Sequence, residues 1–574
     1  MINIEQAVLD KFPGFANKPG LIRRPTISIL KRLIHQNEIN DFLTLNEGTT
    51  GCDFIDLVFD YFNFSYSVSA RDKANIPASG RVVIFANHPI GSLDGLAILR
   101  LVSEVRSDVK IVANDMLSHV SSLQNMLIPL DNMTGGNARR SYKRVLEALE
   151  LEQAVIIFPA GEVSRARPTG VKDTLWRPGF LHFARKTNAP ILPIHIGAKN
   201  SFLFYSASMV FKPLGTALLA REMFNKRSRT IKFSIGETIR ASALESKSLH
   251  DRTLVRRLKK HLYKIGSRRR PIFETEKTIA HPEDRKVLQD ELKEADLLGE
   301  TRDGNRIYVY SYKENSAVIR EIGRLRELAF RKVGEGTGKN RDLDKFDKHY
   351  RHLILWDREN LEIAGSYRLG EGKRILDEYG FEGFYTSTLY DFQPEFKAYL
   401  EQAVELGRSF VNPKYWGKAS LDYLWQGVGA YVNHMGDVRY LIGPVSMSAD
   451  YPRELMDQLV YFYRRYFACP GELAVALHPY KLNDEQIAHF DELFGERDSD
   501  TAFDFMQKNF IQQGHRLPVL YKQYTALFES GGFQSIVFSV DPGFGDCLDG
   551  LCMTDLRKLK TAKKNRYFGK DFNI

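Results

Sequence analysis

Hydrophobic positions in the first half of the chain form short continuous runs separated by amphipathic stretches. Residues 82–86 and 154–158 are apolar throughout, which is typical of strands that a parallel sheet buries on both faces. After the first run, Leu96, Leu99 and Val102 recur at helical spacing. Because strands alternate with helices, the pattern predicts an α/β domain.

The second half of the chain has a different pattern and does not repeat the first. Ile322, Leu325 and Ala329 recur at helical spacing, and residues 361–369 and 384–387 read as strands. A further set of apolar positions predicts one face of a second helix: Phe396, Tyr399, Leu400, Ala403 and Phe410. We therefore expect a second α/β domain.

The length of the chain also favours more than one domain. The 574 residues are 43% hydrophobic and 26% charged, which is enough apolar material for two or three cores. A polar, highly charged stretch follows Arg270. We predict one domain over residues 1–270, a linker over 271–300 and a second domain over 301–574.

Positive charge is concentrated in one stripe. Nine Lys or Arg and no Asp or Glu lie between Arg252 and Arg270, while the whole chain carries +10. Such a face suits anionic lipid, an acidic protein or nucleic acid phosphates, and a plain solvated helix is the alternative. No helix-turn-helix, zinc-finger or RNA-binding signature accompanies the stripe, so we expect no nucleic acid partner. Apolar residues within it predict an amphipathic helix: Leu254, Leu258, Leu262 and Ile265.

The cysteines favour a reducing compartment and no metal site. The chain has four, with no Cys-x-x-Cys pair and no histidine at metal spacing. The N-terminal residues lack a basic region before an apolar core, so we expect no export signal. The cysteines are Cys52, Cys469, Cys547 and Cys552.

The hydrophobic segments predict attachment to a membrane surface and not a membrane span. No segment reaches the roughly 18 to 20 uninterrupted apolar residues that a span requires. Apolar residues 202–205 and 214–220 are followed by basic ones, a combination that suits an anionic bilayer. Packing of these residues in a core is the alternative. The basic residues are Arg221, Lys226, Arg227 and Arg229.

A histidine follows the first apolar run, and an aspartate comes within about two turns of it. The imidazole of His88 can take a proton from an attacking hydroxyl, and the carboxylate of Asp94 can hold its tautomer. Gly91 and Gly95 allow a sharp loop between strand and helix. The alternative for Asp94 is a simple helix cap.

A second polar loop follows the second apolar run, at residues 158–165. The carboxyl ends of parallel strands share one edge of a sheet, so His88, Glu162 and Arg165 are expected to converge on one substrate.

These two loops resemble the motifs of the glycerolipid acyltransferase family. Its Asn-His-x4-Asp and Phe-Pro-Glu-Gly-Thr-Arg-Ser motifs are similar to Asn87-His88 with Asp94 and to residues 158–165, although five residues separate His88 from Asp94. Residues 189–194 resemble the closing Val-Pro-Ile-x-Pro-Val strand of the family.

This resemblance implies transfer of a fatty acyl group from a thioester to a hydroxyl. His88 would act as the general base and Asp94 would orient it. Gly161, Glu162 and Arg165 would bind the acceptor.

A short acidic run with basic residues between and after the aspartates lies in the second half of the chain. Its aspartates are Asp342, Asp344 and Asp347. A solvated, salt-bridged segment is one interpretation, and a site that attracts an ammonium group is the other. Glu405 and Arg408 are three residues apart on the predicted second helix, which would make them neighbours.

The order of these charged positions over residues 300–450 is similar to that of the acyl-homoserine lactone synthases and the ornithine N-acyltransferases, which belong to the Gcn5-related (GNAT) class. The resemblance implies an N-acyltransferase that takes its acyl chain from acyl carrier protein. The matching positions are Arg326, Phe330, Asp342, Asp344, Asp347, Arg368, Glu405 and Arg408.

An amine must lose its proton before it attacks a thioester, so a carboxylate or an ordered water has to accept that proton. Glu405 is the predicted base, with Arg408 holding it ionised. Asp344 and Asp347 are alternatives, either as the base or as anchors for a second ammonium group.

The two motif sets in this order resemble the bifunctional ornithine lipid synthases. The resemblance implies N-acylation of ornithine or a similar amino acid with a 3-hydroxyacyl group, then O-acylation of the 3-hydroxyl. It implies acyl carrier protein thioesters as donors, no bound cofactor, and a cytoplasmic protein at the inner face of the cell membrane. The alternative is a lysophosphatidate-type O-acyltransferase whose C-terminal domain only binds the carrier or the membrane.

Overall fold

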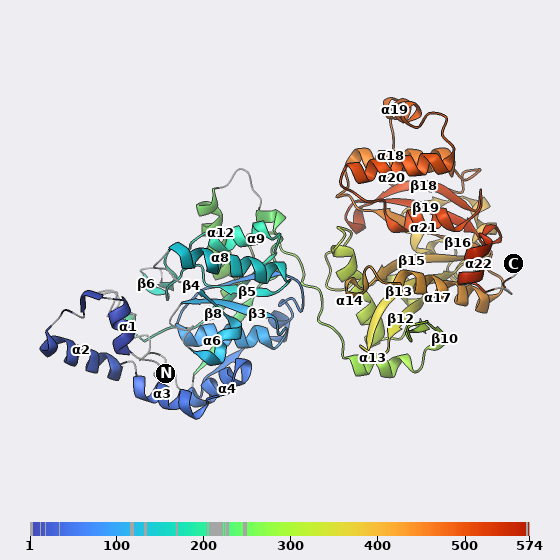
Figure 1. Ribbon diagram of the computed structural model, residues 1–574. Coiled ribbons are helices and arrows are strands. Elements are labelled where there is room, and N and C mark those ends of the chain that lie inside the picture. Colours follow the sequence, from blue (N-terminus) through green and yellow to red (C-terminus); the bar gives the residue numbers. More distant parts are fainter. Residues whose placement is uncertain are drawn as a thin grey trace. The chain divides into compact units, whose positions relative to one another are not determined.

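The chain forms two compact units, Met1–His281 and Pro282–Ile574 (Figure 1). Their boundary lies inside the predicted 271–300 connection, but residues 285–300 form a helix and a strand of the second unit. The computed structural model describes all residues except 1–3, 12, 16, 18, 34, 115–119, 131–134, 168–169, 202–203, 206–221, 223, 225–228, 245–249, 570–571 and 573–574.

A seven-stranded sheet forms the centre of the first unit, with the order β1-β9-β8-β2-β5-β3-β4. Strands β8, β2, β5, β3 and β4 run parallel, and β9 is antiparallel to β8. The parallel strands are fully apolar where they are central, as the sequence predicted. The strands are β1 (Ser65–Ser67), β2 (Val82–Ala86), β3 (Val109–Asn114), β4 (Leu127–Leu130), β5 (Ala154–Ile157), β8 (Ile191–Gly197) and β9 (Thr230–Ile235).

Helices cover both faces of this sheet (Figure 1). On one face the core includes residues of α4 (Gly51–Phe62) and α6 (Ser92–Ser103). The other face packs on α8 (Gly135–Glu150), α9 (Gly179–Lys186) and α12 (Asp251–Gly266). Other elements of the unit are α1 (Ile4–Lys11), α2 (Gly20–Leu33), α3 (Gln36–Leu45), α5 (Ala70–Lys73), β6 (Arg165–Arg167) and β7 (Gly170–Lys172).

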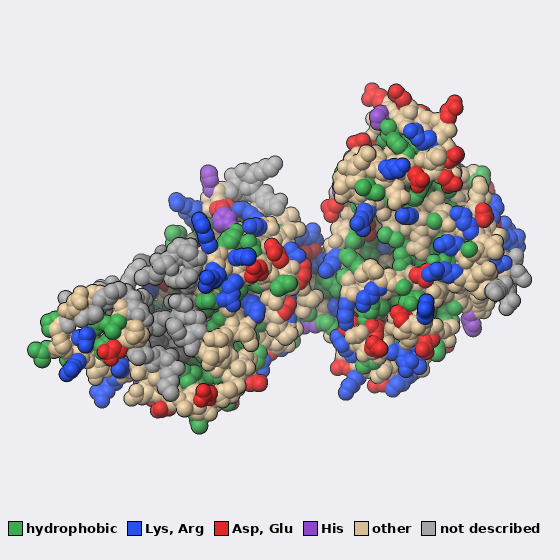
Figure 2. All heavy atoms as spheres, in the orientation of Figure 1, with side chains coloured by type: hydrophobic (Ala, Val, Ile, Leu, Met, Phe, Trp, Pro, Cys, Tyr) green, Lys and Arg blue, Asp and Glu red, His purple; other side chains and the backbone are tan. Residues whose placement is uncertain are grey.

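The helix predicted around the basic stripe is α12, and its apolar face is buried. Leu254, Leu258 and Leu262 lie in the core, while Arg252 and Arg256 are exposed. Lys and Arg side chains gather over the region of α8, α9 and α12 in Figure 2. The predicted helix after the first apolar run is α6.

Part of the predicted membrane-facing segment can be placed. Phe204 and Tyr205 are buried and pack with Val163, so for these two residues the core interpretation holds. Of the rest of that prediction, residues 202–203 and 214–220 with Arg221, Lys226 and Arg227 lie outside the described residues, and Arg229 is exposed. Within the described part of the chain, no helix combines the length and the apolar character that a bilayer span needs.

An eight-stranded sheet forms the centre of the second unit, with the order β10-β11-β12-β13-β15-β16-β19-β18. All neighbours are antiparallel except β15 and β16, which run parallel. The strands are β10 (Asp296–Glu300), β11 (Arg306–Ser311), β12 (Arg351–Asp357), β13 (Glu362–Glu371), β15 (Ala403–Val411), β16 (Tyr440–Met447), β18 (Phe533–Asp541) and β19 (Cys547–Asp555). Strands β14 (Tyr390–Phe392) and β17 (Ala474–Ala476) form a separate pair.

Two sets of helices cover this sheet. The first face packs on α13 (Arg285–Leu292), α14 (Ala317–Arg331), α15 (Gly372–Tyr379) and α16 (Lys397–Leu400). The opposite face packs on α17 (Ser420–Met435), α18 (Arg453–Tyr466), α19 (Asp484–Phe494), α20 (Ser499–Gln512), α21 (Val519–Leu527) and α22 (Thr561–Tyr567).

Two predicted elements of the second unit are wrong. Residues 384–387, predicted as a strand, form part of a 3-10 turn at Tyr385–Thr388. The predicted helix through Phe410 ends at Leu400, and Glu405 and Arg408 lie on strand β15. Strand β15 is central and buried on both faces, so its apolar residues follow no period of two and were misread as part of a helical stripe.

The predicted fold class is confirmed: each unit is an α/β domain. The helix over Ile322–Ala329 is α14, and the strand over 361–369 is β13.

Candidate active sites

His88 lies in the loop after β2, beside the first turn of α6. Its Nδ1 atom is 2.8 Å from Oδ1 of Asp94. Asp94 is fully buried, whereas the side chain of His88 keeps 20% of its exposure. Because Nδ1 faces the carboxylate, Nε2 is the ring nitrogen left for a substrate. This is the arrangement of a general base with an orienting carboxylate.

Asp94 also caps the helix, so both interpretations of this residue hold. Its second oxygen, Oδ2, accepts hydrogen bonds from the N–H groups of Ile90 (2.8 Å) and Gly91 (3.3 Å). Gly91 has a φ of 102°, which only glycine adopts readily. The cap fixes the carboxylate, and the fixed carboxylate in turn fixes the imidazole.

The surroundings of His88 favour its charged form. Burial acts to lower the pKa of His88, but the negative charges of Asp94 and Asp173 act against it, and the net pKa is raised. The ring also stacks on Phe158, with 4.3 Å between ring centroids. An imidazolium that forms during proton transfer is thereby stabilised.

The two predicted loops meet at this edge of the sheet. The N–H of Ser164 donates to the carbonyl oxygen of His88 at 2.7 Å, so the loop after β5 is bonded directly to the loop after β2. On that loop Arg165 lies 3.7 Å from Glu162 and over the ring of Phe204. Gly161 has a φ of 64° and makes the turn.

Sequence reasoning missed Asp173, a fully buried aspartate that joins these loops. Its Oδ1 accepts from the backbone N–H of His88 at 3.2 Å and from the hydroxyl of Ser164. Its Oδ2 accepts from Nε1 of Trp176 at 2.8 Å. A lone aspartate in a loop has no periodic signal, so only the fold reveals it.

We predict that Asp173→Asn impairs O-acyl transfer and shifts its pH dependence. The NH2 group of asparagine would replace one of the two acceptor oxygens and face a donor there, and one charge that raises the pKa of His88 would be lost. Because neutral His88 is the active base, the acid limb of the kcat/KM profile should move to lower pH. The loss of the buried bonds should also destabilise the fold by about 1–3 kcal/mol.

The charged groups around His88 also include Glu162, Arg165 and Lys259, the last bonded to the backbone oxygen of Asp173. None of these changes in the variant. Asp251→Asn, which removes a carboxylate paired with Arg185, is the control. An acid limb that stays in place would mean that Asp173 only supports the fold.

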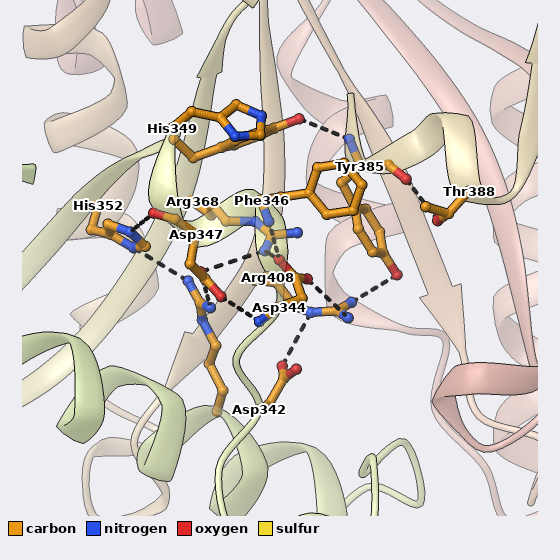
Figure 3. A network of polar contacts seen from close by, with 12 residues as sticks. Asp342, Asp344, Phe346, Asp347, His349, His352, Arg368, Tyr385, Thr388 and Arg408 are labelled. Carbon is orange, nitrogen blue, oxygen red and sulfur yellow. Dashed lines mark hydrogen bonds and ion pairs between the residues drawn. The ribbon is translucent and has the colours of Figure 1, made fainter. Parts of the chain in front are cut away.

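In the second unit, three arginines and three aspartates form one network (Figure 3). Arg326 donates to Asp347 at 2.7 Å, and Arg368 donates to Asp344 at 2.7 Å. The remaining pair has Nε of Arg408 at 3.1 Å from Oδ2 of Asp342. The residues come from α14, from the segment before β12, and from β13 and β15, so the fold brings together six of the charged positions predicted in this half of the chain.

This network holds its carboxylates in different states. Burial acts to raise the pKa of Asp347, but the charges of Arg326 and Arg368 keep it well below its usual range. The pKa of Asp342 is raised because burial outweighs its arginine neighbours. Both oxygens of Asp347 are occupied, since Oδ2 also accepts from the N–H of Asp344. Asp347 thus offers no free oxygen to an ammonium group.

Aromatic rings enclose the arginines. The guanidinium of Arg408 lies 4.5 Å from the ring centroid of Tyr385 and 4.7 Å from that of Phe544. Phe330, predicted as a substrate-binding residue, packs edge-on against Phe544. Arg368 is fully buried and lies 4.9 Å from the Tyr385 ring centroid. The ring of Tyr385 therefore lies between the guanidinium groups of Arg368 and Arg408. No feature of the sequence pattern predicted Tyr385 as a site residue.

A β-bulge in β15 places Glu405 and Arg408 on the same face of the sheet. Ser366 pairs with Phe410 and Arg368 pairs with Gly407, so β15 carries one extra residue. Arg408 has a φ of 47° at this point. On a regular strand, residues three apart face opposite sides, and the extra residue restores a common side.

Glu405 is buried, and its carboxyl group is bonded at both oxygens. Oε1 accepts from the N–H of Thr386 at 3.0 Å, and Oε2 accepts from the hydroxyl of Tyr350. Burial raises the pKa of Glu405 above the ordinary range, and Arg408, which was predicted to hold Glu405 ionised, pairs with Asp342 instead. A raised pKa suits a proton acceptor.

Strands β15 and β16 separate next to this network. They pair only between Ala403–Glu405 and Tyr440–Ile442, and beyond these residues β15 stays paired with β13 alone and β16 with β19 alone. A Cβ on Gly443 would lie 2.2 Å from the carbonyl oxygen of Leu406, so only glycine fits here. A small cavity opens at this gap, lined by Leu406, Trp425, Leu441, Ile442, Gly443, Pro444, Tyr524, Cys552 and Thr554.

A second acidic group near Arg408 was also missed. Glu335 accepts from the hydroxyl of Ser446 at 3.0 Å, and burial raises its pKa to about 7. Burial and the charges of Asp541 and Glu335 raise the pKa of Asp549 far above its usual range. Asp541 caps the 3-10 turn at Pro542–Phe544 by accepting from the N–H of Gly543. Among the described residues, no group of three or more His, Cys, Asp or Glu side chains is arranged to hold a metal ion.

Both units match known protein families. Residues 7–267 match the family described as "Acyltransferase", and residues 325–426 match the family described as "Acetyltransferase (GNAT) domain". A glycine N(alpha)-acyltransferase of Phocaeicola vulgatus is 33% identical over 302 residues, which is 50% of this chain and 92% of that protein. The chain belongs to the family of these acyltransferases.

Two further relatives match parts of this chain. A lyso-glycine lipid O-acyltransferase of Phocaeicola vulgatus is 29% identical over 246 residues, or 42% of this chain and 86% of that protein. An L-ornithine N(alpha)-acyltransferase of Brucella abortus is 34% identical over 121 residues, or 20% of this chain and 42% of that protein. Because both kinds of domain occur in one acyltransferase chain, the predicted resemblance to the bifunctional ornithine lipid synthases is confirmed.

Proposed function

We propose that this acyltransferase makes a two-chain amino-acid lipid. The second unit acylates the α-amino group of an amino acid, and the first unit then acylates a hydroxyl on the new acyl chain. The observation that carries the proposal is the presence of two separate sites in one chain. One is an imidazole–carboxylate pair, and the other is a charged network beside a gap between parallel strands.

The chemistry of the acceptor defines the first acyl chain. Neither glycine nor ornithine carries a hydroxyl group in its side chain. An O-acyltransferase that follows amide formation therefore needs a hydroxyl that arrives with the acyl chain itself. This supports a 3-hydroxyacyl donor for the amide step. Glycine and ornithine are both proposed acceptors, because relatives named for each match this chain.

In the N-acyl step, the amine nitrogen bonds to the thioester carbonyl carbon, and the C–S bond breaks to release a thiol. The amine proton passes by way of Tyr350 to Glu405, whose raised pKa makes it a competent acceptor. In the O-acyl step, Nε2 of His88 takes the proton of the hydroxyl as the oxygen attacks the second thioester.

We propose acyl carrier protein as the donor and α12 as its contact. The exposed side chains of Arg252, Arg256, Arg257 and Lys260 form a cationic face that complements an acidic carrier. Lys259 and Tyr263 of the same helix contact Asp173 beside His88. A thioester delivered at this face would arrive next to the base.

We also propose attachment to an anionic membrane surface at the inner face of the cell membrane. On α2, Leu21 is 91% exposed and Ile29 is 64% exposed, and the helix also carries exposed Arg24 and Arg32. An amphipathic helix of this composition binds the boundary between headgroups and acyl chains. A lipid substrate for the first unit would be reached there.

The test is a reconstitution with the purified full chain. It is given acyl carrier protein thioesters and either glycine, ornithine or lysophosphatidate, and the lipids are identified by mass. An acyloxyacyl amide of an amino acid supports the proposal. Phosphatidic acid without any amide would instead favour a single O-acyltransferase with a binding domain behind it.

We predict that Glu405→Gln lowers amide formation by about 10²-fold or more, since a glutamine cannot accept the proton. The amide oxygen of glutamine can still accept from the N–H of Thr386, and its NH2 group can donate to the hydroxyl oxygen of Tyr350, so the fold should persist. Glu401→Gln, an exposed substitution in the same segment, is the control. Amide formation at the wild-type rate would exclude Glu405 as the base.

A further inference from the structure

A cavity of about 550 Å³ lies among the three N-terminal helices α1, α2 and α3 (Figure 1). Sites for small ligands commonly enclose about 300–1,000 Å³, so this cavity has room for a lipid headgroup. Four basic and two acidic residues line it, which leaves a surplus of positive charge that suits an anion. The basic residues are Arg23, Arg24, Lys31 and Arg32, and the acidic residues are Glu5 and Glu38.

Contacts between distant segments hold the walls of this cavity. The backbone N–H of Ile4, at the start of α1, donates to Oε1 of Gln36 on α3 at 3.0 Å. The ring of His35, between α2 and α3, stacks on Phe224 with 4.0 Å between ring centroids. The three helices are thereby joined to one another and to a later segment of the first unit.

Both acidic residues of the lining already have cationic partners. Oε2 of Glu5 lies 3.6 Å from Nζ of Lys31, and Oε1 of Glu38 lies 2.9 Å from Nδ1 of His35. Arg24 and Arg32, in contrast, have no carboxylate within ion-pair distance among the described residues. A guanidinium group can donate two parallel hydrogen bonds to two phosphate oxygens. These two arginines are therefore available to an anionic ligand.

Two exposed rows of side chains run along α2. Residues four apart lie on the same side of a helix, and each row follows this spacing. The cationic row is Arg24, Ser28 and Arg32, and the apolar row is Leu21, Pro25 and Ile29. Every member of the cationic row lines the cavity. Basic and hydrophobic side chains accordingly lie next to each other over α2 (Figure 2).

We infer that this cavity binds the phosphate headgroup of an anionic bilayer phospholipid, with Arg24 and Arg32 as the residues that contact the phosphate. The inference rests on the proposed attachment to an anionic membrane and adds the site that recognises the lipid. The apolar row would enter the acyl region of the bilayer beside the bound headgroup. A zwitterionic headgroup fits less well, because its ammonium group would meet the guanidinium groups.

The test measures how the purified full chain partitions onto sedimented vesicles of phosphatidylcholine with and without phosphatidylglycerol. We expect the wild type to prefer the vesicles that contain phosphatidylglycerol. Arg24→Gln combined with Arg32→Gln should lower this preference about 25-fold, since one arginine at an anionic surface is worth about fivefold. Both side chains are exposed, so the fold should persist in this variant.

Two further variants separate the site from general charge and from apolar contact. Arg140→Gln combined with Arg144→Gln is the matched control, because it removes the same charge from exposed positions of α8 in the same unit. It should change the preference by less than about twofold, since distant surface charges are screened. Leu21→Ser should weaken binding to both kinds of vesicle by a similar factor and leave the preference unchanged.

An equal loss of preference in the two arginine variants would show that net charge alone attracts the protein, and it would overturn the inference. Displacement of the protein by soluble glycerol phosphate, at the phosphate concentration of the vesicles, would also overturn it, because the site would then serve a free phosphate. A wild type that binds neither kind of vesicle would count against the proposed membrane attachment as well. The two acyl-transfer steps are tested separately by the reconstitution.

Discussion

Replacement of His88 by alanine should stop the enzyme at the single-chain amide. Without the imidazole no group at the end of β2 can take the proton of the attacking hydroxyl, and Asp94 alone is buried and engaged in the helix cap. General-base catalysis by a positioned side chain contributes about 10² to 10⁴ in rate, so the ester should form at least about 10²-fold more slowly. The amide step, which uses the other unit, should proceed normally.

The measurement follows both products by mass over time in the same reaction. The amide should accumulate in the variant, whereas the wild type should convert it to the two-chain lipid. His182→Ala is the control, since His182 is a half-exposed histidine of the same unit, paired with Asp251. Two-chain product at the wild-type rate from the His88 variant would contradict the assignment of the base.

The second large effect concerns stability. Arg368→Met should destabilise the second unit by about 3–5 kcal/mol, because the methionine fills the space but leaves Asp344 and Asp347 without one of their cations. Arg368 has no exposed surface, so water cannot replace the lost charge. Arg326 still neutralises Asp347 in part, at 2.7 Å, and keeps the loss within this range.

Urea unfolding of the full chain measures this effect, with the transition of the second unit followed by the fluorescence of its tryptophans. Trp356, Trp416 and Trp425 lie in that unit. Arg566→Met breaks an ion pair whose arginine side chain is 58% exposed and should change stability by less than about 1 kcal/mol. Equal midpoints for the two variants would show that the buried network carries no net stabilising energy.

The two units differ in how much of their sites could be read from the residues. In the first unit, the apolar run, the loop and the helix follow one another along the chain, so His88 and Asp94 are positioned by local structure. In the second unit, the eight predicted charged and aromatic residues come from several elements that are distant along the chain. Folding alone brings these elements together. Their order along the chain was recognisable, but their contacts were not.

Strand β15 shows why part of the prediction failed. The spacing of apolar residues identifies an element only when one of its faces is exposed to solvent. Strand β15 is covered on both sides by packed helices and loops. The bulge at Arg408 turns both residues to one face of the sheet, but they have different partners. Arg408 pairs with Asp342, and Glu405 bonds to Tyr350 and Thr386.

By itself the sequence determined the two α/β units, the helices with one apolar face, and the motif loops that follow short apolar strands. These features depend on neighbours along the chain, and local spacing records them. The tertiary structure alone decided that Asp173 joins two loops and that Tyr385 lies between two arginines. Such contacts join residues from distant segments, and they arise only when packing removes water from all of them at once.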